Sequence, residues 1–386
     1  MKSQVFVLGP GYVGREIIDL LLSEGQYEIT TLVRREAAVE EFEKDGVKAV
    51  LGDLNDAKVI QQLSAKSDVV FHTATADHLE SAQAILAGIE ERAGQGMYTT
   101  DRVLTWYATG RTNVDMVSCI GKKSIYLHQS GASVLSDTSP GNNVNDEIYS
   151  DKTPSQIDSL SDTAPHRKID LAILKARQKL GNKARMFIWM PPIIYGSNSK
   201  HKRLSIQIPA LTRFACKHGQ AGYVGTGKKA WGVVHVRDLA KVVSPNGMIL
   251  KSPRYLIEFS QAYVQVLHWI EGAADSDPEL QNPYFFCESG EVTWGQVGAI
   301  IGKGLYKAGR ITTPDTRSIP ESEYVDLFGQ FTPDVVGCSC RNRADRLRSM
   351  GWKPEQLGIG EAFEKEDLPA LLAEKGEFKA SEMALS

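Results

Sequence analysis

In the first half of the chain, the pattern of hydrophobic and polar residues predicts strands and helices in regular alternation. Apolar runs predict strands at 5–8, 27–33, 47–50, 68–72, 124–128 and 186–190. Between the strands, apolar residues recur every three or four positions, which predicts helices. The first ends at a C-cap at Gly25, two others cover about 36–44 and 78–92, one follows residue 54, and one begins near Pro165. This regular alternation predicts an α/β fold of the Rossmann type, with a doubly wound parallel sheet and right-handed crossovers.

The second half of the chain has a less regular pattern. A polar tract rich in Asp and Ser, residues 136–162, predicts a long loop. Beyond it, strands are predicted at 231–236 and 284–287, and helices at 206–217, 294–308 and 341–350.

Three glycines separate the first strand from the first helix, at Gly9, Gly11 and Gly14. In a dinucleotide-binding turn the first glycine allows a tight bend, the second lets the backbone approach a pyrophosphate, and the third lets helix and strand pack closely. Tyr12 and Val13 lie between them, at a helix N-terminus whose N–H groups attract phosphate. We therefore predict nucleotide binding here; the alternative is a glycine-rich structural turn.

Arg34 and Arg35 end the second predicted strand. An acidic residue there would accept hydrogen bonds from the ribose 2′-OH of NAD, whereas arginine suits a 2′-phosphate through charge-assisted bonds. The sequence thus favours NADP over NAD, the alternative being two solvated loop arginines. Thr73 and Ala74 follow the strand at 68–72, where small residues let the chain pass over a dinucleotide.

Charge and composition exclude several classes of function. The net charge is −3, which favours neither nucleic acid nor an anionic membrane as a partner, and no apolar run is long enough to cross a bilayer. The first strand begins close to Met1, leaving no room for a signal peptide, so we expect a soluble cytoplasmic protein. Among five cysteines, Cys338 and Cys340 lie close together without His or Cys partners at metal spacing, and we expect no metal site.

These motifs together resemble the extended short-chain dehydrogenase/reductases, also called the NAD-dependent epimerase/dehydratase group. The matching pieces come in family order and cover most of the chain: Gly9-x-Gly11-x-x-Gly14, Gly52-Asp53-Leu54, Asp68-Val-Val-Phe-His72, Ser130-Gly-Ala-Ser-Val134, Pro191-Pro-Ile-Ile-Tyr195-Gly196, His235-Val-Arg-Asp238 and Gly351-Trp352-Lys-Pro354. Within the group the chain looks most like an uncharacterised fungal branch with Pro-His-Arg at the active-site helix.

The resemblance implies a Rossmann core over residues 1–192 and a smaller substrate-binding part over 193–386, with 231–242 and 284–287 returning to the core. Asp53 and Leu54 would lie near the adenine of the cofactor. Pro191, Pro192 and Ile193 would lie near its nicotinamide. The resemblance also suggests a homodimer and a small-molecule substrate.

The chain departs from this family at the residues that do the chemistry. The family uses a Tyr with a Lys four residues later, but none of the thirteen tyrosines has Lys at that spacing. On the matching helix His166 takes the Tyr position and Asp170 the Lys position, and the family's Ser aligns with Gly131, between Ser130 and Ser133.

Two interpretations follow. In the first, the protein is a reductase of a carbonyl or activated double bond in a small organic molecule. His166 is then the proton donor, Asp170 orients it from the same helical face, and Ser130 or Ser133 holds the carbonyl. In the second, the protein binds NAD(P) without turnover, as a regulator of the NmrA type. A sugar-nucleotide epimerase or dehydratase is a third option, which the missing Tyr and Lys disfavour.

Two segments, 97–120 and 243–261, interrupt the pattern and are predicted insertions. Without 243–261, Val242 would adjoin Ala262 and one amphipathic helix would continue through both flanks. Codons compatible with splice signals flank both segments, so we hypothesise that they are translated introns. The alternative is a pair of lineage-specific surface loops, and sequencing of cDNA across both sites distinguishes the two.

Overall fold

The computed structural model describes residues 2–107, 123–137, 147–197, 200–201, 203–240 and 262–374. The chain forms two compact units that interleave along the sequence. The first unit comprises residues 1–130, 167–188 and 267–283, and the second comprises 131–166, 189–266 and 284–386. The predicted division of the chain, with a core over residues 1–192 and a second part over 193–386, stays a prediction.

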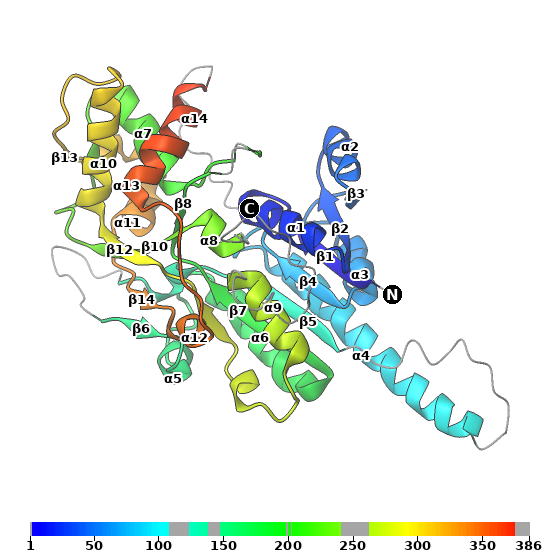
Figure 1. Cartoon of the computed structure of the whole chain (residues 1–386). Helices are drawn as coiled ribbons and strands as arrows, with labels where there is room; N and C mark the ends of the chain where they lie inside the picture. Colours follow the sequence, from blue (N-terminus) through cyan, green and yellow to red (C-terminus); the bar gives the residue numbers. More distant parts are fainter. Residues whose placement is uncertain are drawn as a thin grey trace. The chain divides into compact units, whose positions relative to one another are not determined.

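Parallel strands form the centre of the first unit. They are β1 (Ser3–Leu8), β2 (Tyr27–Val33), β3 (Lys48–Leu51), β4 (Val69–His72), β5 (Ser124–Gln129) and the part of β7 (Ala184–Met190) up to Ile188, in the order β7-β5-β4-β1-β2-β3 (Figure 1). β1 lies between β2 and β4 in parallel register, and β2–β3 and β4–β5 are parallel too. The predicted α/β fold with a parallel Rossmann-type sheet is confirmed.

Helices connect these strands: α1 (Tyr12–Glu24), α2 (Glu36–Lys44), α3 (Ala57–Lys66), α4 (Leu79–Tyr107) and α6 (Arg167–Leu180). α1 ends where Gly25 adopts the left-handed conformation expected of a glycine C-cap. α3, α4 and α6 pack beside one another as one layer. The central strands are largely buried, as in a sheet covered on both faces: Phe6, Val70 and Leu127 have no exposed surface, whereas Leu51 at the end of β3 is exposed.

The second unit is built from small sheets and short helices. β8 (Ile193–Tyr195), β10 (Ala230–His235) and β12 (Gly290–Thr293) form a three-stranded sheet in the order β12-β10-β8, parallel between β8 and β10 and antiparallel between β10 and β12. β9 (Gly222–Tyr223) pairs with β13 (Arg317–Ser318), and β6 (Tyr149–Ser150) with β14 (Asn342–Arg343). β11 (Tyr284–Phe286) is also assigned to this unit.

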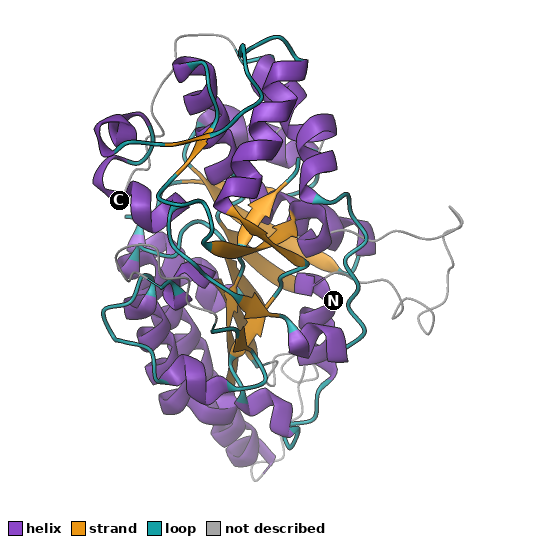
Figure 2. Ribbon diagram, turned by 90° about the vertical axis from the view of Figure 1, so that its left-hand side faces the viewer, coloured by secondary structure: helices purple, strands orange, loops and turns teal. Residues whose placement is uncertain are grey.

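The helices of this unit are α5 (Pro154–Asp158), α7 (Gln207–His218), α8 (Val236–Ala240), α10 (Trp294–Lys307), α11 (Thr332–Val336), α12 (Asp345–Ser349), α13 (Ile359–Ala362) and α14 (Leu368–Leu372). The residues of α9 (Ala262–Gly272) are divided between the two units after Val266. Figure 2 distinguishes the helices of the chain from its strands by colour. α10 matches its predicted range because a capping box, Thr293 with Gln296, fixes its start. Across the described ranges, no helix is both long and apolar enough to span a membrane.

Several predicted elements differ from the structure. α4 continues to Tyr107, well past the predicted end near residue 92, so the first predicted insertion begins inside a helix. The tract 136–162 contains β6 and α5 and is not one long loop. In place of a helix over 341–350, there is the strand β14 and then the short helix α12.

The remainder of the first insertion, 108–120, and the whole of the second, 243–261, lie outside the described residues. α8 ends at Ala240 and α9 begins at Ala262, so helices flank the second segment on both sides. The origin of both segments therefore stays a hypothesis.

Candidate functional site

The glycine-rich loop joins β1 to α1 in the first unit. Gly9 has a φ of 99°, and a Cβ there would lie 2.2 Å from the backbone nitrogen of Ala74. A Cβ on Gly14 would lie 2.2 Å from the carbonyl oxygen of Gly9, so any side chain would push the helix away from the loop. Both glycines therefore hold a close contact between backbone segments.

Gly11 is the residue that leaves space. Nothing lies within 4 Å of the place where its Cβ would be. Gly11 is also the N-cap of α1, no side chain caps this helix end, and its first turn, which begins with Tyr12 and Val13, has no acidic residue. An uncapped helix N-terminus beside an open glycine is what a dinucleotide pyrophosphate requires, so these residues fit an NAD(P) cofactor.

The loop after β4 closes against the glycine loop. Thr73 donates a hydrogen bond of 2.7 Å from its hydroxyl to the carbonyl of Gly9, and Ala74 is exposed beside it. The structure thus brings together Gly9, Gly14, Thr73 and Ala74, four of the residues predicted to bind the cofactor. They meet because β1 and β4 are neighbours whose carboxyl ends coincide, with Leu8 opposite His72.

Arg34 and Arg35 are exposed directly after β2. Asp53, predicted near the adenine, lies in a tight turn after β3: its carboxylate accepts a 2.7 Å bond from the backbone N–H of Asn55, and Leu54 is half-buried. The segments follow the carboxyl ends of β2, which is next to β1, and of β3, which is next to β2, where a nucleotide would extend in this fold. The arginine side chains remain open to an anionic ligand.

A buried polar cluster in the first unit was not predicted. Nδ1 of His72 and Nδ1 of His128 are 3.2 Å apart, and the hydroxyl of Tyr126 lies 3.3 Å from each. Burial lowers the pKa of His72 to about 3, with a smaller contribution from His78. Burial also raises the pKa of Tyr126, and the charge of Asp170 raises it further. The sequence does contain a signal for this cluster. Residues 126 and 128 lie on the same face of one strand, and His72 lies beside His128 on the neighbouring strand.

In the second unit the structure brings Ser133 and His166 together. The Ser133 hydroxyl lies 2.5 Å from Nε2 of His166, and both residues are half-buried. The imidazole occupies the space left by Gly131, where a Cβ would be 2.9 Å from Nε2. Sequence reasoning aligned Gly131 with the family's serine but did not recognise that its missing side chain makes room for the ring.

His166 has an unusual backbone. Its φ of 64° is the only positive value among the non-glycine residues described. It precedes α6, which begins at Arg167 and not near Pro165 as predicted. We expected His166 and Asp170 to share one face of a helix. Residue 166 is not helical, so their spacing gives no reason to expect this. Asp170 itself has no exposed surface.

The segment that carries Ser133 is anchored from both sides within the second unit. Ala132 donates its N–H to the carbonyl of Pro191 at 2.9 Å, and the thiol of Cys340 donates to the carbonyl of Ala132 at 2.7 Å. Cys340 pairs in turn with Trp231 on β10. Of the residues predicted near the nicotinamide, Pro191 thus adjoins the Ser133 segment, Pro192 is buried, and Ile193 is fixed in β8 opposite Val233.

Ser130 differs from Ser133. Its side chain is 4% exposed, and its hydroxyl has no hydrogen-bond partner within the described ranges. Ser133 is more open and is bonded to an imidazole. Of the two candidate serines, Ser133 is therefore the one with a chemical partner.

A second polar cluster of the second unit lies around Glu366. Its carboxylate accepts from Nε2 of His235 and from the backbone N–H of Ser197, each at 2.9 Å, and pairs with Arg237. The adjacent Asp367 accepts from the N–H of Gly196 at 3.3 Å. Burial raises the pKa of Asp367 to about 7, and the charge of Glu366 adds to this shift.

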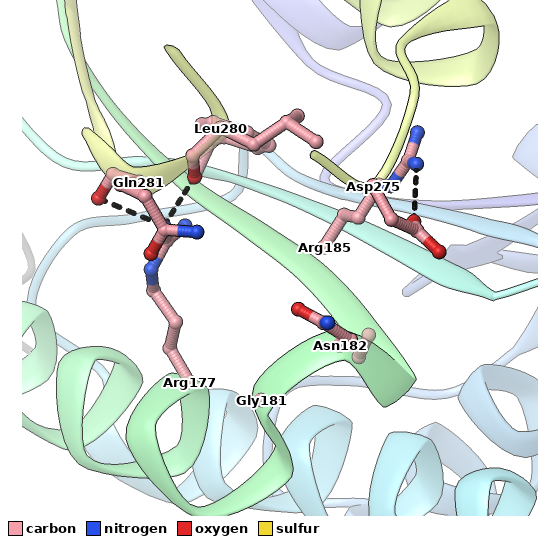
Figure 3. Close-up of a pocket in the computed structure, with 9 residues that line it drawn as sticks. Arg177, Gly181, Asn182, Arg185, Asp275, Leu280 and Gln281 are labelled. Carbon is pink, nitrogen blue, oxygen red and sulfur yellow. Dashed lines mark hydrogen bonds and ion pairs between the residues drawn. The ribbon is translucent and has the colours of Figure 1, made fainter. Parts of the chain in front are cut away.

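A pocket of the first unit, at the start of β7, is lined by the side chains drawn in Figure 3. Arg177 donates to the carbonyl of Gln281 at 2.9 Å, and Arg185 donates to Asp275 at 2.8 Å (Figure 3). Arg185 also donates to the carbonyl of Ala273 at 2.8 Å. Both guanidinium groups thus bind groups of the protein itself. This pocket is distinct from the glycine-rich loop, which follows the end of β1.

Comparisons with known proteins agree with this description. Residues 9–100 match the family described as NAD(P)H-binding. A protein named Oxidase ucsJ, from Acremonium, is 25% identical over 92% of this chain and 93% of its own length. An uncharacterized protein of Saccharomyces cerevisiae, YLL056C, is 22% identical over 92% of this chain and 96% of its own.

Two solved structures show the same fold. A UDP-glucose 4-epimerase of Thermotoga maritima aligns with a TM-score of 0.55 and 12% identity, covering 94% of this chain and 96% of that protein. An ADP-L-glycero-D-manno-heptose-6-epimerase of Helicobacter pylori aligns with a TM-score of 0.56 and 13% identity, covering 96% and 97%. The chain therefore has a Rossmann-type fold similar to those of these two epimerases, and its residues 9–100 match an NAD(P)H-binding family.

Proposed function

We propose that the protein uses NADPH to reduce a carbonyl group or an activated double bond of a small organic molecule. The observation that carries this proposal is the 2.5 Å bond between Ser133 and His166. His166 takes the position of the family's Tyr, and Ser133 lies two residues after Gly131, which takes the position of the family's Ser. The relative from Acremonium, similar over 92% of the chain, is named an oxidase, which supports redox chemistry.

Each residue of the pair has a defined role. The bound cofactor would supply the hydride. Ser133 holds the substrate oxygen through its hydroxyl, and His166 supplies the proton that this oxygen takes up as it is reduced. An imidazole suits this task because its ordinary pKa lies near neutrality. Ser130 is the less favoured partner for the carbonyl because its hydroxyl is buried.

The cofactor is proposed to be NADP in preference to NAD. Arg34 and Arg35 are exposed at the end of β2, with no acidic residue between the strand and Glu36. A 2′-phosphate would accept charge-assisted hydrogen bonds from guanidinium groups at this point, whereas a 2′-OH gains little from them. Replacing both arginines by Ala should therefore weaken NADPH binding at least tenfold and leave NADH binding nearly unchanged.

A non-catalytic, NAD(P)-sensing regulator is the second candidate. One observation favours it: residue 166 lies outside α6 with a positive φ, so the helical Tyr and Lys geometry of the family's catalytic residues has no direct counterpart. An epimerase or dehydratase activity would need the same missing pair. A cytoplasmic location and a homodimer remain part of the proposal.

The test is a titration of purified protein with NADPH and NADH, followed by turnover of a panel of aldehydes, ketones and enones. We expect NADPH to bind more tightly and to be oxidised, and His166→Asn to lower kcat at least tenfold with unchanged NADPH affinity. Ser161→Ala, at an exposed serine of the second unit, is the matched control. Binding without oxidation of NADPH by any member of the panel would favour the regulator, and absence of binding would overturn both.

A further inference from the structure

We infer that Ser133 is a nucleophile and that the pair Ser133–His166 catalyses acyl transfer from activated esters to water, an activity that needs no dinucleotide. Hydrolysis by a serine requires a base within hydrogen-bond reach of its hydroxyl, at about 2.6–3.2 Å. The Ser133 hydroxyl is 2.5 Å from Nε2 of His166, slightly shorter than that range and therefore within reach of the base. Nε2 of a neutral imidazole can accept the hydroxyl proton as the oxygen attacks.

The pair is fixed in place by two backbone features. His166 adopts a φ of 64°, a conformation that side-chain-bearing residues rarely adopt and that is often found where strain serves a function. Gly131 leaves the space into which the ring projects. Together they direct Nε2 at the Ser133 hydroxyl, without relying on the helix that follows.

The pair is also accessible. Ser133 and His166 are both half-buried, so neither residue is enclosed in the core of the second unit. Ser130, three residues earlier, has a buried hydroxyl and no base beside it among the described residues. Accessibility together with an adjacent base distinguishes Ser133 as the nucleophile.

Every bond and proton of the proposed reaction is accounted for by Ser133, His166, the ester and water. The Ser133 oxygen forms a bond to the acyl carbon, the bond from that carbon to the leaving oxygen breaks, and the serine proton passes to Nε2 of His166 and on to the leaving alkoxide. A water molecule then attacks the acyl-serine, again giving a proton to His166, and the acid is released as Ser133 regains its proton. Nothing is oxidised or reduced. The substrates would be esters with good leaving groups and small acyl parts.

The experiment uses the full-length protein without NADPH and two probes, a fluorophosphonate and p-nitrophenyl acetate. The fluorophosphonate should form a phosphoryl–oxygen bond to Ser133 with loss of fluoride, which mass spectrometry of the digested protein locates. His166→Asn should slow this labelling at least tenfold, and Ser133→Ala should abolish it. Asn is chosen because it tolerates a positive φ better than most residues. Ser161→Ala should label as the unchanged protein does.

Hydrolysis of p-nitrophenyl acetate provides a second readout. We expect an initial burst of nitrophenolate that is lost in Ser133→Ala, whose fold is checked by its melting temperature. Absence of any adduct at Ser133 would overturn the inference, as would a labelling rate that His166→Asn leaves unchanged. Because no dinucleotide takes part, either result is independent of whether the protein reduces carbonyl compounds.

Discussion

The ring of His166 lies where the side chain of residue 131 would be. A Cβ on Gly131 would come 2.9 Å from Nε2 and 3.1 Å from Cδ2 of the imidazole. The imidazole thus fills the space that the missing side chain of Gly131 leaves. Gly131 is in this sense a positioning residue.

Gly131→Ala should therefore displace the imidazole without unfolding the protein, because the clashing atoms are the far end of a side chain that can rotate. We expect carbonyl reduction and fluorophosphonate labelling to fall at least tenfold, with little change in melting temperature or NADPH affinity. Gly290→Ala is the matched control, since the nearest atom to its new Cβ would be a Val233 methyl at 3.9 Å. Equal activity of Gly131→Ala and the control would contradict a positioning role.

The positive φ of His166 predicts an unusual order of stabilities for substitutions at this position. A left-handed conformation costs a residue with a side chain about 1–2 kcal/mol and is worst for β-branched residues. His166→Val should therefore lower the free energy of unfolding by about 1–2 kcal/mol more than His166→Asn, and His166→Gly should be the most stable of the three. Urea denaturation measures the order, and a valine variant as stable as the asparagine variant would show that φ is not positive.

Burial of His72 predicts acid sensitivity. Its pKa is about 3 in the folded protein, below the ordinary value of 6.5, so between these values the unfolded chain binds more protons. Stability is thus complete above pH 6.5 and is lost as the pH falls toward 3, by about 2 kcal/mol between pH 7 and pH 5. Denaturation at the two pH values should show a smaller loss in His72→Asn than in the unchanged protein.

His268 provides the control for that measurement. Despite partial burial, the carboxylate of Glu24, 3.0 Å away, raises the pKa of His268. The stability that His268 contributes is present below its ordinary pKa and is lost as the pH rises. This pH dependence is opposite to the one expected for His72. His268→Asn should therefore not reduce the loss of stability at pH 5, and a reduction as large as that from His72→Asn would refute the assignment.

We expect the substitution Asp367→Asn to stabilise the folded protein at alkaline pH. Its pKa of about 7 lies above the ordinary 3.8, so the folded state binds more protons between these values and stability falls as the pH rises through that range. Asp367→Asn removes this dependence and keeps an oxygen to accept the N–H of Gly196. Its stability relative to the unchanged protein should be about 2 kcal/mol more favourable at pH 8 than at pH 5.5. A constant difference would mean that Asp367 titrates normally.

The parts of the fold predicted well are those with a strong local signal. α1 ends at Gly25 and α10 begins at a capping box, because glycine C-caps and Thr–Gln boxes act within a few residues of the helix end. β1 and β4 contain short unbroken apolar runs, and β2 is rich in β-branched residues, as strands of a covered parallel sheet are. Local chemistry and tertiary structure agree at these elements.

The parts missed depend on contacts that a single sequence does not display. α4 extends to Tyr107 although a glycine-containing stretch suggested an end near residue 92. β6 forms inside a polar tract because β14, far along the chain, pairs with it. His166 was expected on a helix, and its left-handed backbone became visible only with its surroundings. The cofactor loop could be predicted from spacing alone, but the partner of Ser133 could not.

The interleaving of the two units has a consequence for synthesis on the ribosome. The first unit includes residues 267–283, and from this segment Glu271 accepts a bond from the hydroxyl of Tyr27, His268 contacts Glu24, and Asp275 pairs with Lys123. The nucleotide-binding unit therefore cannot close its own contacts until residue 283 has emerged. A fragment cut after the last strand of the sheet would lack these contacts, so the amino-terminal half is not expected to mature as an autonomous translation product.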